Sequence, residues 1–163
     1  MAKVFAAARS SRIKAPVSLD GSMRFHPKIW GAATYVRSAR TPVPMLSLGA
    51  RAPSAEELEL NDKLGISYLN SMKYSDVYIG TMQPMTHPHF SAWHLRFSAD
   101  DAFGDYQRAD VMLAHRSGTL YVRRFLDAYL KNDAQALAFS SRSQHDIDTL
   151  SQMRLEGWRS RVR

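Results

Sequence analysis

The segment Thr119-Leu-Tyr-Val-Arg-Arg-Phe-Leu-Asp-Ala-Tyr-Leu-Lys131 carries the clearest periodic pattern in this chain of 163 residues. Its apolar residues recur at intervals of three and four positions, which places their side chains along one face of an α-helix. The members of this stripe are Val122, Phe125, Leu126, Tyr129 and Leu130. Charged residues occupy the other faces, so the segment predicts an amphipathic helix whose apolar stripe packs against a partner.

Another helix is predicted closer to the N-terminus. Ser54-Ala-Glu-Glu57 has the form of a capping box, in which serine and glutamate satisfy free backbone amides at a helix start. Apolar residues that repeat every fourth position extend this helix over about residues 55–73. Residues 77–79, Val-Tyr-Ile, either continue the helix after a kink or form a short strand, because β-branched and aromatic residues favour strands.

Cap-like sequences on both sides of the central segment predict further helices. Residues 84–97 read as a loop rich in histidine and aromatic residues, and a possible cap at 98–101 begins a helix that Gly118 is expected to interrupt. Residues 134–139 continue the helical pattern beyond the central segment. A third cap-like start leads into a helix over about 143–158. The chain is therefore predicted to be mainly helical.

The predicted fold class is mainly α, with a small helical bundle over about residues 54–158. The predicted domain organisation is a basic extended arm at 1–53, a helical body at 54–153 and a basic C-terminal tail at 154–163. The arm is expected to be long and largely irregular because proline and glycine recur throughout residues 16–53 and exclude long helices. Isolated aromatic residues are expected to pin this arm to a surface.

The two ends of the chain are basic, whereas its middle is mildly acidic. Residues 1–53 carry nine lysines and arginines against the single acidic residue Asp20, and residues 54–153 carry nine basic and thirteen acidic side chains. Residues 1–15 contain no acidic residue and are rich in alanine, arginine and serine, which is typical of a mitochondrial targeting segment. A basic disordered tail is the alternative for these residues.

This charge layout predicts that the two ends of the chain contact an anionic partner. The alternatives are nucleic acid, anionic lipid and an acidic protein surface. The apolar stripe adds a predicted protein contact. The residues predicted to contact a partner or an anion are Arg9, Arg12, Lys14, Trp30, Tyr35, Arg37, Arg40, Val122, Phe125, Leu126, Tyr129, Leu130, Arg159 and Arg161.

Motifs that would indicate catalysis or cofactor binding are missing from the sequence. Cysteine is absent, and no glycine-rich phosphate loop or serine-nucleophile motif occurs. His87, His89 and His94 form the only cluster with metal-ligand chemistry, but their spacing matches no specific zinc motif, and we predict a structural role for them. Acidic pairs at 100–101 and 146–148 are explained by helix starts. We therefore predict no catalytic, cofactor or metal site, and no enzyme.

Together these features predict a non-catalytic accessory or structural subunit of a large mitochondrial inner-membrane assembly, either a respiratory-chain complex or the ATP synthase. The subunit is expected to lie peripherally on the matrix side, without a transmembrane segment of its own, and to bind neighbouring subunits and anionic phospholipid. The alternative is an organellar ribosomal protein or another RNA-binding structural protein. A third hypothesis is a metal-dependent enzyme built on the histidine loop.

Overall fold

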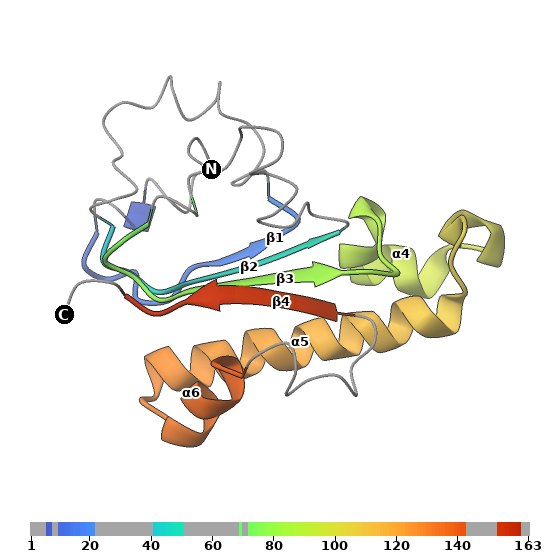
Figure 1. Ribbon diagram of the computed structural model, residues 1–163. Coiled ribbons are helices and arrows are strands. Elements are labelled where there is room, and N and C mark those ends of the chain that lie inside the picture. Colours follow the sequence, from blue (N-terminus) through green and yellow to red (C-terminus); the bar gives the residue numbers. More distant parts are fainter. Residues whose placement is uncertain are drawn as a thin grey trace, which may run out of the picture.

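The computed structural model describes residues 6–7, 10–21, 41–50, 69, 72–142 and 153–160. Strands within these ranges form one four-stranded mixed sheet in the order β1-β2-β3-β4 (Figure 1). Strands β1, β2 and β3 are parallel to one another, and β4 is antiparallel to β3. The strands are β1 (Val17–Leu19), β2 (Met45–Ala50), β3 (Val77–Met82) and β4 (Met153–Trp158).

Apart from the helical residues 6–7, the described helices follow β3 in the chain. They are η3 (His87–Phe90), α4 (Ala92–Phe97), η4 (Asp100–Phe103), α5 (Arg108–Leu130) and α6 (Ala134–Ser140). Figure 1 shows α4 beyond the carboxyl ends of β1, β2 and β3, and α5 running back beneath the sheet in the opposite direction to these strands. Among the helices in these ranges, none combines the length and the apolar character that crossing a bilayer requires.

The two central strands have sequences that suit burial on both faces. Strand β3 reads Val-Tyr-Ile-Gly-Thr-Met, and all six of its residues are buried. Strand β2 reads Met-Leu-Ser-Leu-Gly-Ala, and its first four residues are buried. Such nearly continuous apolar runs are characteristic of parallel strands that are covered on both sides. Of the two alternatives for residues 77–79, the strand is therefore confirmed.

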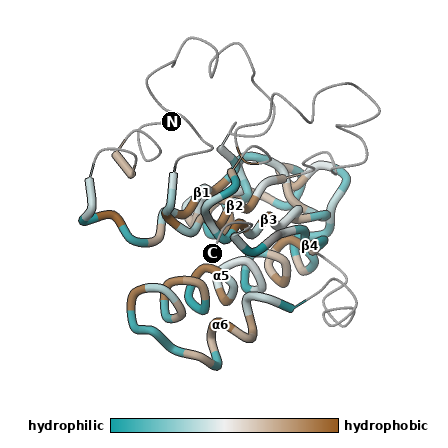
Figure 2. The backbone as a smooth tube through the Cα atoms, turned by 60° about the vertical axis from the view of Figure 1, so that its left-hand side comes forward, coloured by the Kyte–Doolittle hydropathy of each residue, from teal (hydrophilic) through white to brown (hydrophobic). Residues whose placement is uncertain are grey.

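The core lies between α5 and the sheet. From the sheet it contains Leu46, Leu48, Tyr78 and Met82, and from α5 it contains the buried residues Val111, Ala114, Tyr121 and Phe125. The turns of α5 carry hydrophobic and hydrophilic residues on different sides, as the brown and teal segments of the tube in Figure 2 show. The amphipathic helix predicted for Thr119–Lys131 is therefore confirmed, apart from Lys131, which lies just beyond the end of α5.

Gly118 does not interrupt this helix, contrary to the prediction from sequence. It lies in the middle of α5, where a Cβ atom would approach Met82 Cε to 3.3 Å and Leu48 Cδ1 to 3.4 Å. Because glycine has no side chain, the helix can pack closely against β2 and β3 at this position. Glycine within a helix costs about 1 kcal/mol relative to alanine, and the close packing at Gly118 offsets this cost.

The prediction of a mainly α helical bundle is wrong, because the structure is built around a mixed sheet. Residues 17–19 and 45–50 were assigned to an irregular arm, yet they form β1 and β2 in the same sheet as β3. Residues 153–158 were assigned to a helix and form β4. These segments of three to six residues are too short for hydrophobic periodicity to separate strand from helix.

Other predicted elements have mixed outcomes. The helix predicted for residues 134–139 is confirmed as α6, and the Asp133 carboxylate caps it by accepting hydrogen bonds from the amides of Gln135 and Ala136. The predicted loop at 84–97 contains η3 and α4. The helix predicted for 55–73 lies almost entirely outside the described residues, as does the cap-like start at 143–146.

Candidate active site

The parallel strands bring two polar side chains to one edge of the sheet. Because β1, β2 and β3 run in the same direction, their carboxyl ends meet at this edge, which is the usual position of ligand sites in open α/β sheets. Asp20 follows β1 directly, and His87 begins η3 shortly after the end of β3. Their side chains meet although 67 positions separate them in the chain.

The Asp20 carboxylate, which follows β1, contacts the end of β2 and the start of η3. Its Oδ2 atom lies 2.5 Å from Nδ1 of His87, and its Oδ1 atom accepts a hydrogen bond of 2.8 Å from the backbone amide of Ala50. The backbone amide of Asp20 donates to the carbonyl of Leu48. The carboxylate side chain is 19% exposed, whereas the imidazole of His87 is 80% exposed. The acid is thus fixed by the sheet, and the imidazole faces solvent.

Asp20 adopts a backbone conformation that non-glycine residues rarely adopt. Its φ angle is +47°, in the left-handed region. Aspartate tolerates this region better than most residues do, and such outliers occur preferentially at functional sites. In this conformation the carboxylate contacts both the backbone amide of Ala50 and the ring of His87.

The contact with Asp20 fixes which nitrogen of His87 carries the proton. An ionised carboxylate can only accept a hydrogen bond, so Nδ1 of His87 must donate. In the neutral imidazole, Nε2 then has a free lone pair. Within the part of the chain that the structure describes, His87 has no second hydrogen-bond partner. Nε2 is therefore available to accept a proton from another molecule.

The other two histidines of the loop have a different environment. His89 is almost fully buried, its Nδ1 accepts a hydrogen bond of 3.0 Å from the amide of Thr86, and its ring stacks on Phe103 at 5.1 Å. His94 also packs on Phe103. His87 faces Asp20 instead, so the three histidines do not converge. Among the described residues, no three potential ligands gather into a metal site.

The buried histidines predict that stability decreases in mild acid. Burial, followed by the neighbouring His94 ring, lowers the pKa of His89 below its usual value, and burial also lowers the pKa of His115. The unfolded chain therefore binds more protons below about pH 6.5, and each histidine contributes at most about 1.4 kcal/mol per pH unit. We expect the free energy of unfolding to fall as the pH is lowered from about 7.5 to about 5.

Urea denaturation at several pH values within that range tests this prediction. In His89→Gln the buried titratable group is replaced by a neutral amide that can still accept from the amide of Thr86. This variant should lose less stability than the wild type over the same pH interval. An identical decrease in the two proteins would contradict a role for His89.

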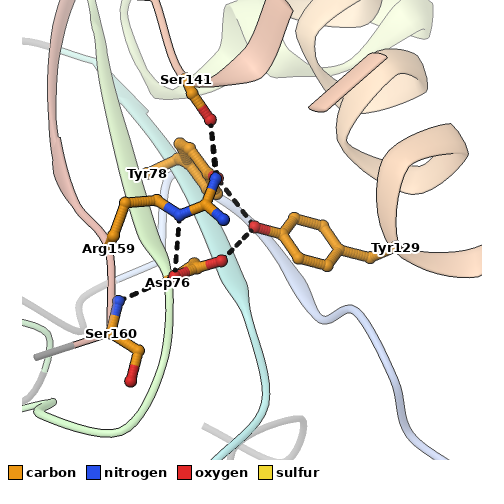
Figure 3. A network of polar contacts seen from close by, with 6 residues as sticks. All are labelled: Asp76, Tyr78, Tyr129, Ser141, Arg159 and Ser160. Atoms are coloured by element: carbon orange, nitrogen blue, oxygen red, sulfur yellow. Dashed lines mark hydrogen bonds and ion pairs between the residues drawn. The ribbon is translucent and has the colours of Figure 1, made fainter. Parts of the chain in front are cut away.

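A second polar cluster lies at the opposite edge of the sheet, around Asp76, which precedes β3 (Figure 3). The hydroxyl of Tyr129 donates to Asp76 Oδ2 at 2.7 Å, and the amide of Ser160 donates to Asp76 Oδ1 at 2.8 Å. Arg159 forms an ion pair with the same carboxylate at 3.2 Å. Burial, with hydrogen bonds to Tyr78 and Asp76, raises the pKa of Tyr129. Because these groups satisfy one another, the cluster has a structural role.

The residues predicted from sequence to contact a partner lie in several places. Arg12 and Lys14 are exposed just before β1, and Arg159 belongs to the Asp76 cluster. Phe125 is fully buried against the chain's own sheet, whereas Leu130 is 55% exposed. Val122, Leu126 and Tyr129 are partly buried and pack against the core. Six predicted contact residues fall outside the described ranges: Arg9, Trp30, Tyr35, Arg37, Arg40 and Arg161.

The sequence-based reasoning missed both Asp20 and His87. Asp20 was counted only as the single acid of a basic arm, and His87 was considered only as a metal ligand. Both follow short apolar runs, at 17–19 and 77–82, that end close to a glycine or a proline. Reading those runs as parallel strands would have placed the two residues at one edge.

No protein-family model, curated protein or solved structure matches this chain. The candidate active site therefore stands on the geometry of Asp20 and His87.

Proposed function

We propose that this protein hydrolyses carboxylic esters, with His87 as the general base and Asp20 as the carboxylate that orients it. The observation that carries this proposal is the 2.5 Å contact between His87 Nδ1 and Asp20 Oδ2 at the carboxyl edge of the parallel strands. A histidine that is held by a carboxylate through Nδ1, with Nε2 open to solvent, is the arrangement that accepts a proton from an attacking hydroxyl group.

In the proposed reaction, Nε2 of His87 removes the proton from a hydroxyl group of serine or of water. The oxygen of that hydroxyl forms a bond to the carbonyl carbon of the ester. The bond between this carbon and the leaving oxygen then breaks, and Nε2 returns the proton to the leaving oxygen. If serine attacks, the acyl group remains on the serine oxygen, and water that is deprotonated by Nε2 then attacks the acyl carbon, releases the carboxylic acid and restores the serine hydroxyl. Asp20 keeps Nδ1 protonated and stabilises the positive charge that develops on the imidazole ring.

A purely structural role explains the pair less well. Exposed ion pairs contribute little to stability, and the His87 side chain is 80% exposed. The fold nevertheless fixes the Asp20 carboxylate with the amide of Ala50 and holds Asp20 at a positive φ angle.

Two substitutions test the proposal directly. We expect His87→Ala and Asp20→Asn to reduce kcat/KM for hydrolysis of p-nitrophenyl acetate by about 100-fold or more, because each removes part of the general base. Asp100→Asn is the matched control, since Asp100 forms an exposed ion pair with Arg108 near the same loop. Equal rates in all four proteins, with unchanged thermal unfolding, would contradict the proposal.

A fluorophosphonate probe identifies the attacking hydroxyl group. If a serine attacks, the probe should label that serine, and peptide mapping by mass spectrometry should locate it. Labelling should then be at least tenfold slower in His87→Ala, because the serine loses its base. Hydrolysis without labelling would instead assign the attack to water.

The sequence-based prediction of a non-catalytic mitochondrial accessory subunit stays a prediction, as does its RNA-binding alternative. The exposed positions of Arg12 and Lys14 are compatible with an anionic partner. Co-purification from the native source tests both ideas. Recovery of inner-membrane complex subunits would favour the first, and recovery of RNA that is lost steeply at raised salt would favour the second.

A further inference from the structure

An apolar cavity of about 220 Å³ lies between α5 and the sheet. Leu48 of β2 and Met82 of β3 line it from the sheet, and Gly118 and Val122 line it from α5. Gly118 contributes no side chain, and a Cβ atom there would already contact both Met82 and Leu48. The cavity therefore lies beside a position where the helix packs closely against the sheet.

Residues that line the cavity are close in sequence to both Asp20 and His87. Leu19, which lines the cavity, directly precedes Asp20. Met85 and Phe90 also line the cavity, and they flank His87 on its two sides in the chain. The same short segments thus position the catalytic groups and form part of the cavity wall.

The lining favours an uncharged occupant. Apart from His115 and Thr119, the lining residues are apolar or glycine, and none is aspartate, glutamate, lysine or arginine. Burial lowers the pKa of His115, which favours its neutral form. Leu19 is 49% exposed at one side of the cavity, and Thr119 is exposed on α5, so the cavity is reached from solvent. Cavities lined mainly by apolar side chains next to a few convergent polar groups are typical of small-molecule sites.

We infer that this cavity receives the uncharged apolar acyl group of the ester, an inference that rests on the proposed function. A cavity of about 150 Å³ accommodates benzene. The cavity of about 220 Å³ is therefore large enough for an aromatic ring or for an acyl chain of about six carbons. Each methylene group that is buried improves binding about fourfold, so an ester of hexanoate should be preferred over an ester of acetate.

The experiment compares p-nitrophenyl hexanoate with p-nitrophenyl acetate as substrates and measures binding of hexan-1-ol by NMR titration. In the wild type we expect kcat/KM for the hexanoate ester to exceed that for the acetate ester by roughly tenfold or more. Val122→Phe places a ring in the cavity from α5, and Thr119→Phe does so from an exposed position that tolerates substitution. Leu113→Phe is the matched control, because Leu113 is 45% exposed on the same helix and does not line the cavity.

We expect Val122→Phe and Thr119→Phe to reduce the hexanoate preference at least fivefold and to weaken hexan-1-ol binding, whereas Leu113→Phe behaves as the wild type. Unchanged preference and unchanged hexan-1-ol binding in both cavity variants would overturn the inference. His87→Ala should keep hexan-1-ol binding while losing ester hydrolysis, which separates the cavity from the general base. If the wild type hydrolyses neither ester, the proposed function fails and the cavity's assignment to an acyl group fails with it.

Discussion

Replacement of Phe125 by alanine is expected to lower the free energy of unfolding by about 3–5 kcal/mol, the range for truncating a buried phenylalanine. The ring of Phe125 is fully buried between α5 and the sheet. Its centroid lies 5.8 Å from that of Tyr78 and 5.0 Å from that of Tyr129, so truncation removes two aromatic contacts as well as apolar area. Urea denaturation followed by circular dichroism measures the loss.

Leu130→Ala provides the matched control for this substitution. Both residues belong to the apolar stripe predicted from sequence, but Leu130 is 55% exposed and alanine favours helix slightly more than leucine does. We expect this variant to change the free energy of unfolding by roughly 0.5 kcal/mol or less. Similar losses in the two variants would mean that the whole stripe is equally buried, as the sequence pattern alone predicted.

The difference between these two residues shows what periodicity can and cannot predict. The pattern around Phe125 predicts a helix correctly because the spacing of apolar residues is a local property of the chain. It does not fix which side of that helix is most deeply buried, because the sheet that covers α5 comes from distant segments. The buried face in fact extends from Val111 through Gly118 and Phe125 to Ala128.

The sheet itself was not predicted because its strands are short and pair over long distances. Strand β1 has three residues, and β4 has six residues that also fit a helical spacing. Parallel pairing gives no hairpin signal, since the two partners are joined by long connections rather than tight turns. The prediction of an irregular arm treated Leu46 as an isolated apolar anchor, whereas it belongs to the buried strand β2.

The candidate site was missed for the same reason. Asp20 and His87 have no spacing that marks them as partners, since 67 positions separate them. The two residues are brought together because β1 is parallel to β2 and β2 is parallel to β3, which places the carboxyl ends of these strands at one edge of the sheet. A site of this kind follows from the topology of the sheet. Because residues 1–53 were predicted to form an irregular arm, there was no reason to place Asp20 near His87.

The second large effect is expected for Asp76→Ala, which should lower the free energy of unfolding by about 2–4 kcal/mol. The Asp76 side chain is 15% exposed and accepts hydrogen bonds from the Tyr129 hydroxyl and the Ser160 amide. Hydrogen bonds to a charged group contribute about 1.5–3 kcal/mol each. Removing the carboxylate eliminates the hydrogen bond that it accepts from the Ser160 amide and breaks the ion pair with Arg159.

The same substitution should loosen β4 more than the rest of the sheet. Arg159 and Ser160 directly follow β4, whose last residue, Trp158, pairs with Val77 next to Asp76. We therefore expect faster amide hydrogen exchange at the end of β4 in Asp76→Ala, with the amides of the β2–β3 pair still protected. The matched control is Asp127→Ala, because its side chain is also 15% exposed but forms its ion pairs with the exposed side chains of Lys131 and Arg123 on the surface of α5 and just beyond its end. If exchange in β4 rose equally in both variants, the Asp76 cluster would not be what holds β4 against β3.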